Sequence, residues 1–152
     1  MLRTVAGVGA LALALAAVAL AAPEKSAYNL TANLRARSEV PKPTGVPTKA
    51  VGLFTGKAVE LKGDQARITW RLTFSHLTGA AVAAHIHAGR PGVAGPVLLA
   101  LCGPCTNGQK GTGTITHAQL ATIASGGAYV NVHTAKNAPG EIRGQVKASE
   151  SG

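Results

Sequence analysis

Acidic and aromatic side chains are scarce in this sequence. Six Asp or Glu residues stand against fifteen Lys or Arg, and aromatic residues make up 3% of the chain. Few carboxylates leave few candidates for paired-carboxylate catalysis, and few aromatic rings leave no platform on which nucleic-acid bases would stack. The basic residues are also scattered along the chain, so we expect no nucleic acid as a partner.

Motifs of common hydrolases and transferases are absent as well. The glycine-rich segment 89–95 lacks the Lys-Ser/Thr ending and the following helix that a phosphate-binding P-loop requires. No serine lies in a sharp glycine-flanked turn between a strand and a helix. The sequence therefore favours a protein that is not an enzyme, and leaves the alternative open.

One long hydrophobic run is present, at the start of the chain. A single basic residue, Arg3, precedes an apolar stretch from Val5 to Ala22, and Ala19-Leu20-Ala21 has the small-x-small pattern that a signal peptidase accepts. We predict a signal peptide over 1–21, a linker over 22–27, one domain over 28–148 and a tail over 149–152. The protein is then secreted or periplasmic; the alternative is an uncleaved leader that anchors it in a membrane.

The positive charge suggests what the exported chain would meet. Without Arg3 the mature chain carries about +8, which would draw it to an anionic envelope polymer, lipid head groups or an acidic protein. The alternative is that the charge only keeps an exported protein soluble.

Short apolar runs separated by glycine and proline predict an all-β fold. The clearest run alternates Ile68, Trp70, Leu72 and Phe74 with polar residues, as a strand with one wet face would. We predict about seven strands over 28–34, 50–61, 67–74, 82–88, 97–102, 128–134 and 141–147. Together with one short helix, these strands predict a Greek-key β-sandwich of immunoglobulin-like or superoxide-dismutase-like type.

The helix is predicted from a capping box. Thr116 has the side chain of an N-cap and Gln119 follows three residues later. We expect about two turns that end near the glycines at 126 and 127.

Three histidines form the most specific candidate site. His85 and His87 are one residue apart in a predicted strand, so both point to the same face. His133 lies in another predicted strand, and if the two strands are neighbours the three rings would suit copper or zinc. The alternative is that they line a polar face and hydrogen-bond to the backbone or to Asn131. His76 and His117, at a strand end and a helix start, are weaker candidates.

Cys102 and Cys105 form a Cys-Gly-Pro-Cys segment. A redox-active dithiol of this spacing normally follows a strand and begins a helix in an α/β fold, which this sequence does not predict. In an oxidising compartment we expect a disulfide that closes a tight loop. A metal-bound dithiolate and thiol exchange remain as minor alternatives.

Several segments resemble the CHRD (chordin-type) domain family in the order in which they occur. They are Glu39-Val40-Pro41, Trp70-Arg71-Leu72, 84–89 (AHIHAG), 95–97 (GPV), 129–134 (YVNVHT) and 139–145 (PGEIRGQ). The resemblance covers about 28–148 and implies a β-sandwich. Its motifs contain all three candidate ligands, and the His-x-His strand is similar to the copper strand of copper/zinc superoxide dismutase, although no convincing zinc ligands accompany it.

Glu141 and Arg143 also fall in one of these motifs. Their one-residue separation places them on the same face of a strand. We expect a structural ion pair, either between these two residues or with a neighbouring strand, rather than a binding site.

Three hypotheses on function follow. The first is an exported, non-enzymatic CHRD-domain binding protein of the cell envelope or extracellular space, with a copper or zinc site at His85, His87 and His133. The second is a copper-dependent redox enzyme that resembles a copper-only superoxide dismutase. The third is a structural or adhesive envelope protein that uses its basic surface.

Overall fold

A computed structural model describes residues 26–151 of the chain. The predicted signal peptide and residues 22–25 of the predicted linker lie outside the described residues. No helix in the described part is long and apolar enough to cross a membrane.

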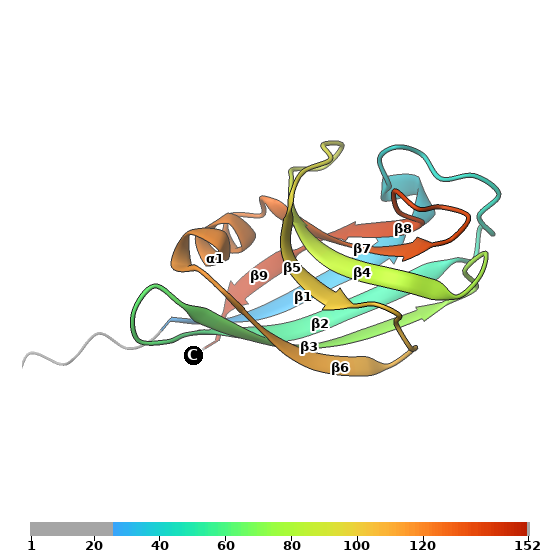
Figure 1. Cartoon of the computed structure of the whole chain (residues 1–152). Helices are drawn as coiled ribbons and strands as arrows, with labels where there is room; N and C mark the ends of the chain where they lie inside the picture. The colour runs from blue at the N-terminus through green and yellow to red at the C-terminus, as the bar shows by residue number, and fades with distance from the viewer. Residues whose placement is uncertain (1–25, 152) are drawn as a thin grey trace, which may run out of the picture.

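The described residues form nine strands, one α-helix and one 3₁₀ helix (Figure 1). In chain order they are β1 (Ala27–Arg35), η1 (Ala36–Ser38), β2 (Val51–Glu60), β3 (Ala66–Ser75), β4 (Ala81–Ala88), β5 (Val97–Cys102), β6 (Gln109–Ile115), α1 (His117–Ala124), β7 (Ala128–Thr134), β8 (Ile142–Gln145) and β9 (Lys147–Glu150). The ordered sheet thus starts one residue before the predicted domain and continues two residues into the predicted tail.

All strands belong to one antiparallel sheet. Hydrogen-bonded neighbours follow the order β5-β4-β7-β8-β1-β2-β3-β6, and β9 also pairs with β1. Strands β5 and β6, at the two ends of this order, approach each other, so the sheet curls into a nearly closed barrel (Figure 1). The all-β prediction with one short helix is confirmed. The Greek-key sandwich is not confirmed, because strand pairing continues through one sheet instead of dividing into two.

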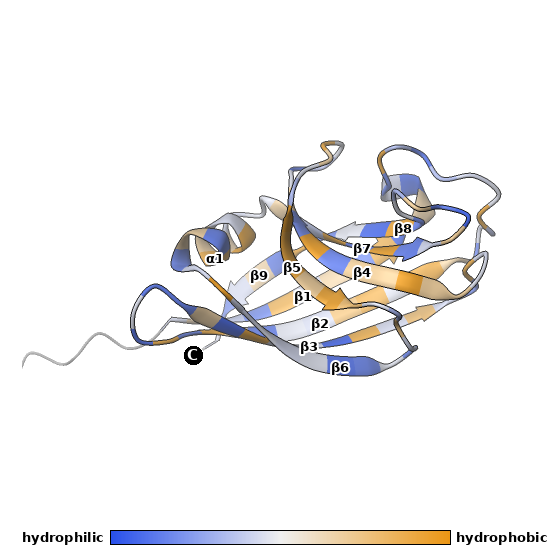
Figure 2. Cartoon of the chain, in the orientation of Figure 1, coloured by the Kyte–Doolittle hydropathy of each residue, from blue (hydrophilic) through white to orange (hydrophobic). Residues whose placement is uncertain are grey.

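Alternating side chains fill the inside of the barrel. Leu30, Phe54, Ile68, Leu72 and Ile86 point inward and are at most 1% exposed. Figure 2 shows apolar positions alternating with polar ones along these strands. Each buried side chain of this size contributes about 1.5–3 kcal/mol of hydrophobic free energy, so the alternation itself holds the sheet in register.

Strand β6 was not predicted, because its sequence QKGTGTI carries almost no apolar signal. Two of its inward positions, Gly111 and Gly113, are glycines, and side chains from other strands fill the space beside them. A Cβ on Gly111 would overlap the Trp70 ring, and one on Gly113 would lie 2.8 Å from Leu99 Cδ2. Large side chains of β3 and β5 therefore replace those that β6 lacks. The predicted strand over 141–147 is divided into β8 and β9 at the buried Val146.

The helix begins as predicted. The Thr116 hydroxyl accepts from the Gln119 backbone N–H, and the Gln119 side chain accepts from the Thr116 backbone N–H. Leu120 and Ile123 are its buried residues, and the helix packs against β9 and β7.

One part of the sheet is covered on both faces. Every residue of β7 is buried, whereas exposed and buried residues alternate in β3. The second cover over β7 and β8 comes from loops, because Arg143 donates to the carbonyls of Arg90 and Val93, and Asn137 accepts from Thr44 N. The candidate site lies in this covered layer.

Candidate metal centre

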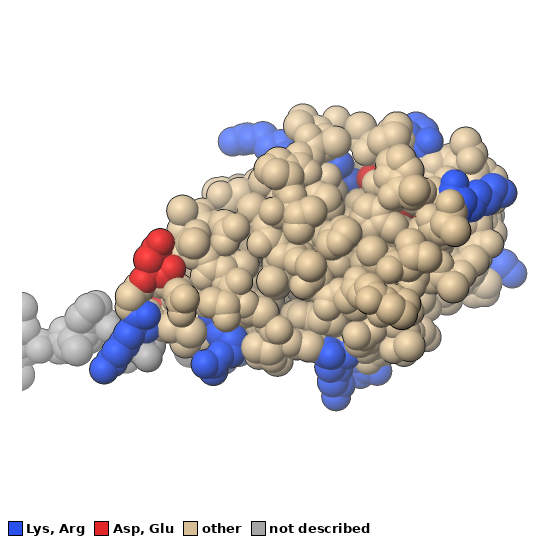
Figure 3. All heavy atoms as spheres, viewed as in Figure 1, with Lys and Arg blue, Asp and Glu red and all other residues tan. Residues whose placement is uncertain are grey.

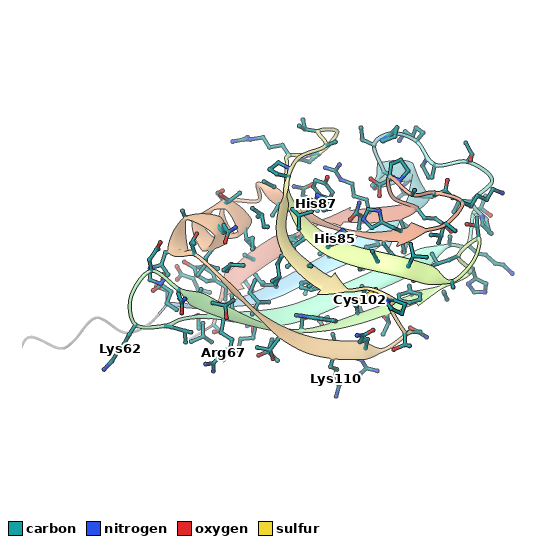
Figure 4. The ribbon with its side chains drawn as sticks, viewed as in Figure 1. Lys62, Arg67, His85, His87, Cys102 and Lys110 are labelled. Carbon is teal, nitrogen blue, oxygen red and sulfur yellow. A yellow bond between two sulfur atoms is a disulfide. The ribbon has the colours of Figure 1, made fainter. Side chains whose placement is uncertain are left out.

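Pairing of β4 with β7 brings the three histidines together. His85 lies opposite Asn131, and Ala83 lies opposite His133. Directly opposed residues in an antiparallel pair share a face, so His133 is on the same side as His85 and His87. Figure 4 shows His85 and His87 on β4, on the side of the barrel away from Lys110.

The three imidazole rings converge. His85 Nδ1 is 3.0 Å from His133 Nε2, and one ring nitrogen from each of the three residues lies within 4.8 Å of the others. Two nitrogens bound to one ion at about 2.0–2.1 Å lie about 2.9–3.4 Å apart at ordinary coordination angles. The pair from His85 and His133 already has this spacing. The three nitrogens together lie within 4.8 Å of one another, so the rings would have to approach by about 1.5 Å to hold one ion.

Hydrogen bonds to the backbone determine which nitrogens face inward. His87 Nδ1 donates to Gly95 O and His133 Nδ1 donates to Ala138 O, each at 2.8 Å. A neutral imidazole that donates through Nδ1 carries its lone pair on Nε2. His87 Nε2 is buried and has no hydrogen-bond partner among the described residues. Backbone carbonyls that orient imidazoles in this way are typical partners of metal-binding histidines.

The hydrogen bond between His85 and His133 fixes the position of the ring proton of His85. Because His133 Nε2 carries a lone pair, His85 Nδ1 donates to it in the metal-free protein. Coordination through His85 Nδ1 would move that proton to the other nitrogen of the same ring, so it needs no net deprotonation.

Burial favours the neutral form of two of these rings, those of His85 and His133. Desolvation lowers the pKa of His85 below its ordinary value of 6.5, and the neighbouring His133 and His87 lower it further. Desolvation also lowers the pKa of His133, against the hydrogen bond to Ala138. Neutral imidazole is the form that binds a metal ion, and the cluster contains no carboxylate or thiolate. The residues therefore fit an ion that accepts an all-nitrogen set, such as copper or zinc.

The family model of the CHRD domain matches residues 30–146. The chain belongs to the CHRD domain family. No curated protein and no solved structure matches the chain. The resemblance in the sequence motifs is thereby confirmed over nearly the same span.

In this CHRD domain the His87 ring lies in a stack with the side chains of Tyr129 and Arg143. The Tyr129 ring lies parallel to His87, with centroids 4.9 Å apart, and the Arg143 guanidinium carbon is 3.3 Å from the centroid of the Tyr129 ring. Tyr129 Oη accepts from Gly95 N at 3.3 Å. The stack therefore orients the His87 ring. Through Tyr129 Oη it also holds Gly95, whose carbonyl accepts the hydrogen bond from His87.

Arg143 and Glu141 do not pair with each other, although such a pair was one of the two arrangements expected for them. Arg143 Nη2 donates to the carbonyls of Arg90 and Val93. Burial lowers the pKa of Arg143, against the opposing influence of Tyr129 and of the charge of Glu39. The Glu141 carboxylate accepts instead from Thr78, Thr134 and Asn137. Glu141 precedes β8 and turns toward the β3–β4 connection, so the two side chains diverge despite their spacing in the sequence.

Glu39 is a buried carboxylate that sequence reasoning did not identify as special. It is 1% exposed, and its Oε2 has no partner in the described part of the chain. Burial raises the pKa of Glu39, against the hydrogen bond from Val40 N and the charge of Arg143. A signal for Tyr129 existed, because it shares the face of His133 by strand alternation. The signal for Glu39 was its place in the family-like segment Glu39-Val40-Pro41, which does not reveal that its side chain is buried.

The other candidate residues lie elsewhere. Cys102 and Cys105 are joined by a disulfide at the end of β5, with an S–S distance of 2.12 Å. His76 Nδ1 is 3.0 Å from Ser75 Oγ. His117 contacts Gln65 O and lies 3.9 Å from Asp64. Neither of these two histidines belongs to the cluster.

Proposed function

We propose that this CHRD domain binds one copper or zinc ion through His85 Nδ1, His87 Nε2 and His133 Nε2. The observation that carries the proposal is the convergence of three mostly covered imidazoles, two of which are oriented by backbone carbonyls. These residues hold the ion and exclude bulk water from much of its surroundings. Copper would supply one-electron redox chemistry there, and zinc would supply Lewis acidity.

We propose further that the protein is exported and acts as a metal-binding protein of the envelope or extracellular space. The apolar leader with its cleavage motif supports export. The Cys102–Cys105 disulfide supports it too, because disulfides persist in oxidising compartments.

A copper-dependent redox enzyme is the second candidate. The observation that favours it is the number of ligands: three imidazoles leave a coordination position open, as catalytic metal sites do. The Arg143 guanidinium, held behind Tyr129, adds positive charge near the cluster. A dismutase assay of the copper-loaded protein separates the two candidates, since a binding protein would show no turnover above that of free copper.

Calorimetric titration with Cu(II) and Zn(II) tests the site. We expect one equivalent to bind, and we expect each of His85→Gln, His87→Gln and His133→Gln to weaken binding at least about a hundredfold. The matched control is His76→Gln with His117→Gln, which removes histidines outside the cluster and should leave affinity unchanged. Circular dichroism checks that every variant is folded.

NMR of the zinc-loaded protein labelled with ¹⁵N-histidine tests the assignment of atoms. The metal-bound nitrogen should be Nδ1 in His85 and Nε2 in His87 and His133. Equal affinity in the cluster variants and the control would refute the proposal, and so would coordination through Nδ1 of His87 or His133.

A further inference from the structure

The outward face of β9, β1, β2, β3 and β6 is cationic. Its outward positions alternate with the core positions, and five of them are exposed cations. These are Lys57, Arg67, Arg71, Lys110 and Lys147. We call these outward positions the cationic sheet face. The acidic residues of this half of the barrel, Glu60, Asp64 and Glu150, lie at strand ends and in the β2–β3 turn. In Figure 3 one group of acidic side chains lies at one end of the molecule beside a basic side chain, and other basic side chains project along its lower edge.

Strand register arranges this face in rows. One row across the sheet is Thr31, Thr55, Arg71 and Lys110, and the next is Asn29, Lys57, Thr69 and Thr112. Strands lie about 4.8 Å apart and alternate residues of a strand about 6.8 Å apart, so each cation has another within roughly 5–12 Å. Hydroxyl and amide groups fill the positions between the charges.

These charges are not used within the fold. In residues 26–151 the single salt bridge is between His117 and Asp64, and none of the five cations donates a side-chain hydrogen bond. Figure 4 shows Arg67 and Lys110 pointing away from the barrel. Their full charge is therefore available to an external anion.

The chemistry of the face favours one kind of partner. Its outward positions carry no aromatic ring on which nucleic-acid bases would stack. Within the part of the chain that the structure describes, the one exposed large apolar side chain of the face is Leu53, at 41% exposed, and a single such side chain is too little for insertion into lipid. Threonine and asparagine side chains can instead exchange hydrogen bonds with sugar hydroxyls. At one end the face continues into a depression of about 380 Å³ lined by further polar groups of Asn33, Arg35, Thr73 and Asn107.

We propose that the cationic sheet face binds an acidic polysaccharide, a linear glycan with repeated carboxylates. Repeated anionic groups match a row of cations spaced within about a nanometre, and the intervening hydroxyls and amides bind the neutral parts of the sugars. This face lies on the side of the barrel away from the histidine cluster, so the proposal is independent of metal binding.

Binding to polygalacturonate, measured by biolayer interferometry at low and at physiological salt, tests the proposal. The face variant is Lys57→Gln with Arg71→Gln and Lys110→Gln. The control variant is Lys49→Gln with Arg90→Gln and Lys136→Gln, which removes the same charges from exposed loops. We expect the face variant to bind at least about tenfold more weakly and the control to bind nearly as the wild type, with salt weakening both.

Three further probes are neutral dextran, a single-stranded DNA oligonucleotide and phosphatidylglycerol vesicles. Weaker binding to all three than to polygalacturonate supports the proposal. Equal losses in the two triple variants would show that net charge alone attracts the glycan and would overturn it. DNA or vesicles bound as tightly as the glycan through the same face would overturn the choice of partner, and no binding to polygalacturonate would overturn the whole proposal.

Discussion

Replacing Glu141 by glutamine should destabilise the fold strongly. Its carboxylate is fully buried and accepts from Thr78 N at 2.6 Å, Thr134 Oγ1 at 2.5 Å and Asn137 Nδ2 at 3.1 Å, and it also accepts from the Thr78 hydroxyl. These contacts tie the β3–β4 connection to β7 and to the turn before β8. Glutamine keeps the shape but presents an NH₂ group to donors that need an acceptor.

The size of the effect follows from those contacts. Hydrogen bonds to a charged group contribute about 1.5–3 kcal/mol each, and a buried donor left without an acceptor costs about 1–3 kcal/mol. Glutamine retains one acceptor oxygen, so about half of the network is lost, and partial relaxation reduces the cost to about 2–4 kcal/mol. For a domain of this size the melting temperature should fall by roughly 10 °C.

The stability lost in Glu141→Gln should be smaller at low pH than at neutral pH. Burial alone would raise the pKa of Glu141, but hydrogen bonds from Thr134, Thr78 and Asn137 outweigh it and lower the pKa below 4.5. A carboxyl group whose pKa is lower in the folded state stabilises the protein above its unfolded pKa, and this contribution is lost as the pH falls through the folded pKa. The difference between wild type and variant should therefore be full at pH 7 and narrow below pH 4.5.

Urea denaturation followed by circular dichroism at pH 7 and pH 4 measures both effects. Glu150→Gln is the control, because it makes the same charge change at an exposed position. The reasoning is refuted if Glu141→Gln costs less than about 0.5 kcal/mol, or if its cost is the same at every pH.

Three further predictions concern the centre and its surroundings. Burial lowers the pKa values of His85 and His133 below 6.5, so protonation of these two ligands should weaken metal binding only below pH 6.5. NMR titration of their two rings would contradict this if either became protonated at a higher pH. Tyr129→Phe removes one neutral hydrogen bond and should lower the free energy of unfolding by about 0.5–1.5 kcal/mol. Tyr129→Leu also removes the aromatic ring that contacts both His87 and Arg143, so it should weaken copper binding. Equal copper affinities of the two variants would count against a role of the stack. Cys102→Ser with Cys105→Ser opens a four-residue loop and should cost about 2 kcal/mol in urea denaturation, and no change would show that the bridge does not constrain the unfolded chain.

Local patterns explain which parts of the fold were predictable. The alternation around Trp70 and the capping box at Thr116 depend on neighbours within a few residues, so both were readable from the sequence. Strand β6 was missed because Gly111 and Gly113 leave their space to Trp70 and Leu99, which are distant in the chain. The alternation of apolar residues in a sequence reveals a strand that supplies core side chains. It does not reveal a strand such as β6, whose glycines leave space for the side chains of other strands.

The candidate metal centre could likewise be predicted only in part from the sequence. Alternation alone places His85 and His87 on one face, because the period of a strand is two. It cannot place His133 beside them, since that depends on the pairing of β4 with β7. Nor can it separate Glu141 from Arg143, whose partners Thr78 and Arg90 come from loops far along the chain.

The sequence by itself therefore determined the family, the all-β class, most strand boundaries and the identity of the candidate ligands, because each depends on local order along the chain. Only the tertiary structure decided that one sheet curls into a nearly closed barrel, which nitrogens of the three histidines face one another, and that the unpaired cations share one face. These features depend on strand register and loop packing, which arise from contacts between segments far apart in the sequence.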